Sequence, residues 1–333
     1  MLKRMLVLFL MVSFTVAMGF AGASAEQASH QSGTALTKLD KPVTVVVPFP
    51  VGSAIDVRAR IVMKYAEKQL GTTVVIENKP GAAGLIGATE FVTGKSKGYD
   101  ILFCGVGVFT AVPLFNQAAY SLDDIVPLVS VDKEQFGMFV NPDKSGIRTI
   151  EDLKSFGRNI KYSTGAPGSI GYISCTTALL LMGVPADLIV TAGASISLTE
   201  NLGGHNDIAF AGLGLAKGFV DEGKLLPLFT FNAEDYLGYE GVTVPSLHSL
   251  GIDYDYESLT FFSMKKSEDQ AVVDFVKNVL VETLKNEACR AELVAAGAST
   301  LYNITTEEIV SHSLREYEIM REYGPKIGLT LTR

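Results

Sequence analysis

The strongest constraint on the fold is a unit that recurs along the chain: an apolar strand, a loop of small residues, then an amphipathic helix. In its first copy, Val43–Val47 is a β-branched run, Pro48 and Pro50 end it, and a helical pattern begins near Ala54. Two further copies follow before about residue 115. Strands that alternate with helices predict a mostly parallel sheet, whose ligands bind beyond the carboxyl ends of the strands.

A second α/β pattern begins after the turn cluster Asn141–Gly146. Apolar runs at 160–162, 189–191 and 207–210 are each followed by a glycine-rich or small-residue loop. The pattern predicts a second sheet in a second domain, and 333 residues provide enough chain for two cores.

Three of these loops are candidate binding sites: 51–56, 105–107 and 163–169. The first backbone N–H groups of a helix lack acceptors and attract anions. None of the three loops contains Lys or Arg, so an anion there would be held by neutral donors. The loop 163–169 has an alternative interpretation as an ordinary helix cap. Asp56 could accept a ligand ammonium or amide, or it could be an acid favoured by the helix dipole. Tyr172 could face the ligand or pack in the core.

The glycines of Gly81–Ala88 resemble a dinucleotide-binding fingerprint only weakly. The first two glycines are three positions apart instead of two, and no suitably placed acidic residue follows a later strand. Tight packing between helix and sheet at Gly84 and Gly87 is the alternative that we favour.

The N-terminus has the pattern of a secretory signal peptide. Lys3 and Arg4 precede the apolar run Met5–Phe20, and Ala23–Ala25 fits a cleavage site after Ala25. An uncleaved membrane anchor is the alternative. Residues 26–37 are rich in small and polar residues and are predicted to be a flexible tether.

The formal net charge of −8 argues against binding to nucleic acid or to an anionic membrane surface.

Cys104, Cys175 and Cys289 can form at most one disulfide and are predicted to be buried free thiols. The four histidines have no metal-ligand spacing, and the loops contain no nucleophile–base pair, so no metal, cofactor or catalytic residue is predicted.

The chain resembles the substrate-binding proteins of tripartite tricarboxylate transporters, the TctC or Bug family. The matching segments run in order along nearly all of the chain after the signal peptide: Val45–Gly52 with Asp56 and Arg60, Val75–Gly84 with Ile86–Ala88, Gly98–Leu102, Tyr162–Ser169, Leu202–Phe210, and Val244–Pro245 with Gly251.

The resemblance implies a two-lobed α/β fold of the type II periplasmic-binding-protein class, with a mixed sheet flanked by helices in each lobe and closure around the ligand like a flytrap. It places residues 38–138 and 262–333 in lobe one and residues 139–261 in lobe two. Residues 1–25 are the predicted signal peptide and residues 26–37 the tether.

The resemblance also implies that a ligand carboxylate is held by backbone N–H groups and waters of the lobe-one loops, and that a second carboxylate or polar end meets the lobe-two loops. The residues carried over by position are Phe49, Val51, Gly52, Ser53, Ala54, Asp56, Gly105, Val106, Gly107, Ser163, Thr164, Gly165, Gly168, Ser169 and Asp207.

Three segments depart from the family pattern. Gly52–Asp56 reads Gly-Ser-Ala-Ile-Asp where the family usually has Gly-Gly-x-Thr-Asp. Cys104–Gly107 stands in place of Gly-Ser-Ser-Gly, and Val190–Gly193 stands in place of Pro-Tyr-Lys-Gly. The losses include two hydroxyls, a tyrosine and a lysine. They favour a smaller or more apolar carboxylate over a highly charged tricarboxylate.

The function implied by the resemblance is that of a monomeric periplasmic solute-binding protein. It would capture a small carboxylate in the cleft between its lobes and deliver it to the membrane subunits of a tripartite transporter. A sensor that docks onto a membrane signalling partner is an alternative, and an exported enzyme is a third reading.

Overall fold

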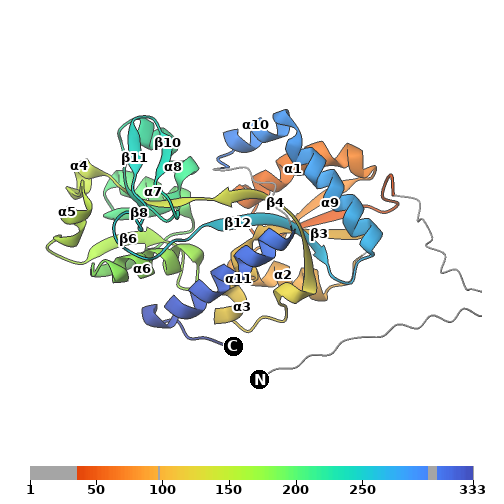
Figure 1. Ribbon diagram of the computed structural model, residues 1–333, viewed down its shortest axis with the longest axis horizontal. Coiled ribbons are helices and arrows are strands. Elements are labelled where there is room, and N and C mark those ends of the chain that lie inside the picture. Colours follow the sequence, from red (N-terminus) through yellow and green to blue (C-terminus); the bar gives the residue numbers. More distant parts are fainter. Residues whose placement is uncertain (1–35, 97, 299–305, 333) are drawn as a thin grey trace, which may run out of the picture. The chain divides into compact units, whose positions relative to one another are not determined.

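The computed structural model describes residues 36–96, 98–298 and 306–332, and their strands form two five-stranded sheets and one small hairpin (Figure 1). The predicted signal peptide and nearly all of the predicted tether lie outside the described residues. No helix among the described residues combines the length and apolar character that crossing a membrane requires.

The first sheet has the strand order β2-β1-β3-β12-β4. Its strands are β1 (Val43–Val47), β2 (Val74–Asn78), β3 (Tyr99–Gly105), β4 (Ile125–Glu134) and β12 (Ser258–Lys265). β1 pairs in parallel with β2 and β3, whereas β12 runs antiparallel to both β3 and β4. The sheet is therefore mixed, because a strand from late in the chain inserts beside the early parallel strands.

Helices cover this sheet and supply its core. α1 (Ala54–Leu70) packs against α9 (Gln270–Lys285) and α10 (Glu287–Ala295), while α2 (Leu85–Thr93) contacts β1 and β3. The predicted tight packing at Gly87 is present, since a Cβ there would lie 2.6 Å from the Lys79 carbonyl oxygen.

The second sheet has the order β7-β6-β8-β5-β9. Its strands are β5 (Phe136–Val140), β6 (Ile160–Thr164), β7 (Ala186–Val190), β8 (Ile208–Gly212) and β9 (Leu226–Thr230). β6 is parallel to β7 and β8, and β5 is antiparallel to β8 and β9. Its helices and hairpin are α4 (Pro142–Ser145), α5 (Ile150–Lys154), α6 (Ile170–Leu181), α7 (Ala194–Gly203), α8 (Leu213–Asp221), and β10 (Tyr236–Tyr239) with β11 (Val242–Val244).

The chain passes between the sheets at two strands that Figure 1 shows running side by side, β4 and β12. β4 leads into β5 through Gln135 alone, so β4 ends four residues before the predicted lobe boundary at residue 138. α11 (Thr306–Tyr323) contacts elements on both sides, because Ile309 belongs to a core beside the first sheet and Met320 to the core of the second. The exact division into lobes remains a prediction.

The predicted two-lobed, mixed α/β architecture is confirmed. The three cysteines are free and buried, as predicted. The sequence analysis did not identify α3 (Ala111–Phe115), α8 or the β10–β11 hairpin. Pro113 interrupts the pattern of α3 and Gly214 and Gly218 that of α8, and the hairpin strands are only four and three residues long, so their local signals are weak.

Candidate functional site

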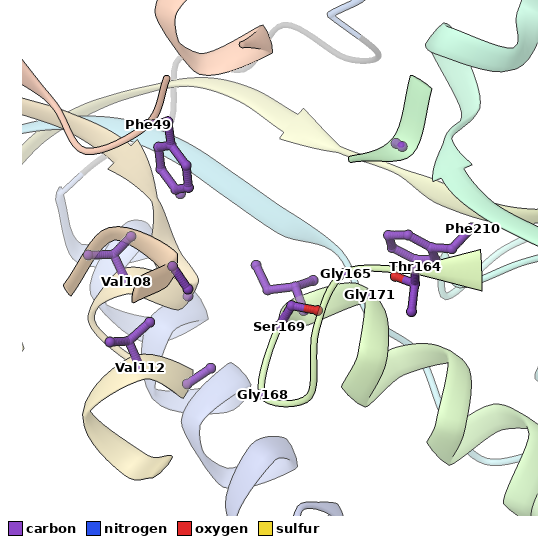
Figure 2. Close-up of a pocket in the computed structure, with 15 residues that line it drawn as sticks. Phe49, Val108, Val112, Thr164, Gly165, Gly168, Ser169, Gly171 and Phe210 are labelled. Carbon is purple, nitrogen blue, oxygen red and sulfur yellow. The ribbon is translucent and has the colours of Figure 1, made fainter. Parts of the chain in front are cut away.

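A pocket of about 250 Å³ lies beyond the carboxyl ends of strands from both sheets (Figure 2). One wall comes from the segments after β1, β2 and β3 and from α3, and the other from the β6–α6 loop, α6, α7 and β8. The lining residues are Phe49, Ala83, Gly105, Gly107, Val108, Ala111 and Val112 on the first wall, and Thr164, Gly165, Gly168, Ser169, Ile170, Gly171, Ala194 and Phe210 on the second.

Thr164 and Ser169 carry the polar side-chain atoms of this lining, and none of the lining residues is charged. Thr164 is only 3% exposed, and its hydroxyl has no hydrogen-bond partner among the described residues. Ser169 Oγ accepts a 3.3 Å hydrogen bond from the Tyr172 N–H, which leaves its own proton available to donate. The pocket therefore offers two hydroxyl donors and no ionic partner.

The start of α6 adds backbone donors to the same wall. Ser169 is the N-cap of this 12-residue helix, and the N–H groups of Ile170 and Gly171 in its first turn have no acceptor within the helix. Gly165 and Gly168 in the preceding loop also have N–H groups without a backbone acceptor in the described part of the chain. Together with the helix dipole, these groups favour an anion at this end of the pocket.

Glycine is required here because the wall is packed tightly. A Cβ on Gly171 would lie 2.0 Å from Thr164 Oγ1 and 2.9 Å from Phe210 Cδ1. A Cβ on Gly165 would lie 2.7 Å from Ser169 Oγ. The glycine density of this loop therefore keeps both hydroxyls accessible, and the loop both caps α6 and lines the pocket.

The polar groups of the first loop, between β1 and α1, are largely hydrogen-bonded to other groups of this chain. Ser53 caps α1 by accepting a hydrogen bond from the Asp56 N–H, and Asp56, only 1% exposed, accepts a 2.8 Å hydrogen bond from the Gly52 N–H. The Asp56 carboxylate also pairs with Arg60 at 2.9 Å and accepts from Asn78. Burial alone would raise the pKa of Asp56, but the hydrogen bonds from Arg60, Gly52 and Asn78 hold it below its ordinary value.

Asp56 therefore lies in the first turn of α1 with its carboxylate bonded to groups of this chain, an arrangement that agrees with the second of its two predicted roles. Phe49 lines the pocket from this loop, whereas Val51, Gly52 and Ala54 are exposed outside it.

Asp207 lies at the amino end of β8, at the end of the second sheet opposite the pocket. It precedes β8, accepts a 2.8 Å hydrogen bond from the Lys161 N–H near the start of β6, and forms a two-pronged pair with Arg158 at 2.6 and 2.8 Å. Thr164, the last residue of β6, lines the pocket. The position of Asp207 before its strand, instead of after it, explains why it does not reach the pocket.

Seven of the predicted site residues line the pocket: Phe49, Gly105, Gly107, Thr164, Gly165, Gly168 and Ser169. The others do not: Val51, Gly52, Ser53, Ala54, Asp56, Val106, Ser163 and Asp207. Val106 and Ser163 are fully buried, and the Ser163 carbonyl accepts a hydrogen bond from Ser197. Tyr172 packs away from the pocket, with its hydroxyl donating to the Ile327 carbonyl at 3.0 Å.

The sequence analysis missed most of the apolar lining. Val108, Ala111, Val112 and Ile170 follow the predicted loops within a few residues, so extending each loop into the next helical turn would have found them. Phe210 lies within β8, and no feature of the sequence distinguishes it from its neighbours.

A buried acid lies directly behind the pocket. Glu316 on α11 is 2% exposed and accepts a hydrogen bond from the Thr110 hydroxyl. A Cβ on Gly107 would lie 3.5 Å from Glu316 Oε1. Burial raises the pKa of Glu316 to about 7, against the opposing effect of the Thr110 hydrogen bond.

Comparisons with known proteins agree with this architecture. The family model TctC, "Tripartite tricarboxylate transporter family receptor", matches residues 58–319. Protein BugT of Bordetella pertussis (strain Tohama I) is 24% identical over 298 residues, which cover 86% of this chain and 90% of BugT.

Two solved structures are similar in fold. Rpa4515 of R. palustris, solved with adipate, has a TM-score of 0.75 and 19% identity, and the alignment covers 87% of this chain and 98% of that one. MatC (Rpa3494) from Rhodopseudomonas palustris, solved with bound malate, has a TM-score of 0.70 and 21% identity, with 86% and 98% covered.

Proposed function

The chain belongs to the TctC family of tripartite tricarboxylate transporter receptors, and we propose that it is a periplasmic solute-binding protein that captures a small carboxylate between its two lobes. The observation that carries this proposal is the wall formed by Thr164, Ser169 and the first turn of α6. It gathers two hydroxyls and several unpaired backbone N–H groups around one pocket. Such a set of donors suits a carboxylate, whose two oxygens accept several hydrogen bonds.

Neutral donors also suit a protein that must release its ligand. A carboxylate held only by hydroxyl and amide groups leaves without breaking a buried ion pair. We therefore propose that the bound carboxylate is handed to the membrane subunits of a tripartite transporter. The predicted signal peptide and the family both support a location in the periplasm.

We propose a binding role without catalysis. Neither Thr164 nor Ser169 has a histidine, carboxylate or amine beside it in the pocket lining that could activate its hydroxyl. The structures with adipate and malate support a carboxylate as the class of ligand, because both belong to proteins of the same fold.

The test is a thermal-shift screen of the purified mature chain against small carboxylates, followed by calorimetric titration of those that raise the melting temperature. The amide of the best carboxylate should bind at least about tenfold more weakly, because it lacks the charge that the donor wall recognises. Equal affinity for acid and amide would contradict the proposal.

A variant locates the site. Thr164→Val keeps the side-chain shape but removes the hydroxyl, and we expect the affinity for the carboxylate to fall about tenfold. Thr199→Val is the matched control, since Thr199 lies on α7 outside the pocket with its hydroxyl bonded to the Ser195 carbonyl. If both variants bind as well as the unmodified chain, the Thr164 hydroxyl does not hold the carboxylate.

A further inference from the structure

The two ends of the pocket differ in chemistry. The side-chain hydrogen-bond donors, the hydroxyls of Thr164 and Ser169, lie at the β6–α6 loop, whereas Val108, Ala111 and Val112 form the end contributed by the β3–α3 region. Figure 2 shows Val108 and Val112 on one side of the pocket and Gly165, Gly168 and Ser169 on the other. A ligand that places its carboxylate against the donors therefore directs the rest of its structure toward hydrocarbon.

This apolar end has no basic side chain that could pair with a second charge. Val108, Ala111 and Val112 are 3%, 2% and 4% exposed, so the surface that they present is largely shielded from water. No lysine, arginine or histidine lines the pocket. A second carboxylate placed there would lose its hydration without gaining a counter-ion, which is strongly unfavourable.

Two further features oppose a dianion and favour an apolar group. The carboxyl group of Glu316 lies just behind Gly107, and negative charge on it would repel a second ligand carboxylate. Phe49 and Phe210 contribute aromatic rings to the lining, which pack well against a ring or a branched chain.

We propose that the ligand is a monocarboxylate with a single compact apolar group of about the size of a benzene ring, and that Val108 and Val112 select it over dicarboxylates. This inference rests on the proposed function and specifies its ligand class. The volume is consistent with it: an apolar cavity of about 150 Å³ accommodates benzene, and this pocket of about 250 Å³ leaves room for the carboxylate as well.

The experiment compares defined probes on the purified mature chain by calorimetric titration. Benzoate and cyclohexanecarboxylate carry one charge and one compact apolar group, acetate lacks the apolar group, and adipate and malate carry two charges. We expect the better of the two ring acids to bind at least about tenfold more tightly than acetate, adipate or malate. Benzamide, which keeps the ring but not the charge, should bind at least about tenfold more weakly than benzoate.

A substitution tests the proposed selecting surface. Val112→Asn places a polar side chain of similar size in the apolar end and should reduce affinity for the better ring acid about tenfold, while affinity for acetate changes little. Val294→Asn is the matched control, because Val294 is 58% exposed on α10 and does not line the pocket. The probe series on the unmodified chain tests the inference even if Val112→Asn does not fold.

The outcomes separate the two proposals. Tight binding of adipate or malate with weak binding of both ring acids would overturn this inference and leave the proposed carboxylate-binding function intact. Equal affinity for ring acids and dicarboxylates would do the same. A folded Val112→Asn protein with unchanged affinity for the better ring acid would overturn the selecting role of this surface. No binding of any carboxylate in the screen would overturn the proposed function itself, and the inference with it.

Discussion

Gly107 and Ile170 approach each other across the pocket so closely that a Cβ on Gly107 would lie 2.8 Å from Ile170 Cδ1. Gly107 follows the third strand of the first sheet, and Ile170 begins α6 beside the second sheet. The two walls of the pocket therefore meet at a position where a hydrogen atom replaces a side chain.

This contact predicts the effect of Gly107→Val. The added side chain would push against Ile170 and fill part of the pocket, so we expect ligand affinity to fall more than about tenfold. Gly157→Val is the control, because a Cβ there meets no atom within 4 Å. Calorimetric titration of both variants with the best carboxylate measures the effect, and undiminished affinity in Gly107→Val would exclude this position from the site.

Gly52→Val should reduce stability and leave ligand affinity unchanged, in contrast to Gly107→Val. Gly52 has a φ of +81°, and a Cβ there meets nothing within 4 Å, so the change strains the backbone without blocking the pocket. We expect a loss of about 1–2 kcal/mol in unfolding free energy, with the ligand affinity of the folded protein retained. Denaturant unfolding and titration of the same preparation measure both quantities. A large loss of affinity in a stable Gly52→Val protein would show that the first loop does bind the ligand.

Asp207→Asn tests a residue that the sequence analysis placed in the site and the structure places at the other edge of the sheet. The substitution weakens the pair with Arg158, whose side chain is 52% exposed, so the cost in stability should be at most about 1 kcal/mol. Ligand affinity should not change. A tenfold loss of affinity without a shift in melting temperature would be inconsistent with the position described for Asp207.

Glu316 predicts a dependence of stability on pH. Its pKa is raised to about 7 in the folded protein, from an ordinary value of 4.5. Between these values the unfolded chain has released this proton while the folded chain retains it, so rising pH favours unfolding. This contribution to stability is fully present below pH 4.5 and is lost as the pH rises to about 7.

Over this pH range, the titration of Glu316 lowers the unfolding free energy by about 3 kcal/mol in total. Glu316→Gln removes it, so the difference in unfolding free energy between the variant and the unmodified chain should vary with pH across that window. Comparing the two proteins cancels the contributions of other groups, including half-buried His312, whose pKa is lowered chiefly by burial. A difference that stays constant from pH 4.5 to 7 would contradict this prediction.

The two strands that connect the sheets predict a hinge. β4 and β12 carry the chain between the two sheets, and bending near Gln135 would alter the pocket without disturbing either core. We expect the radius of gyration from solution scattering to decrease when the best carboxylate saturates the protein. An unchanged scattering profile at demonstrated saturation would argue against closure.

The sequence by itself determined the fold class, because strand runs such as Val43–Val47 and the small-residue loops that follow them are local signals with a periodicity specific to α/β folds. It also indicated the β6–α6 loop as a candidate binding loop, since the first N–H groups of a helix attract anions, and the same loop also caps α6. The buried state of all three cysteines followed from their number and apolar surroundings.

Only the tertiary structure decided which loop residues face the pocket. The sequence does not distinguish an Asp56 carboxylate that contacts a ligand from one that bonds to the Gly52 N–H and Arg60. Which partners the carboxylate has depends on how α1 and β2 pack. Val112, Phe210 and Glu316 come together from segments up to 204 residues apart. A sequence pattern reports local periodicity, whereas the polarity of a pocket is set by side chains that only long-range packing brings together.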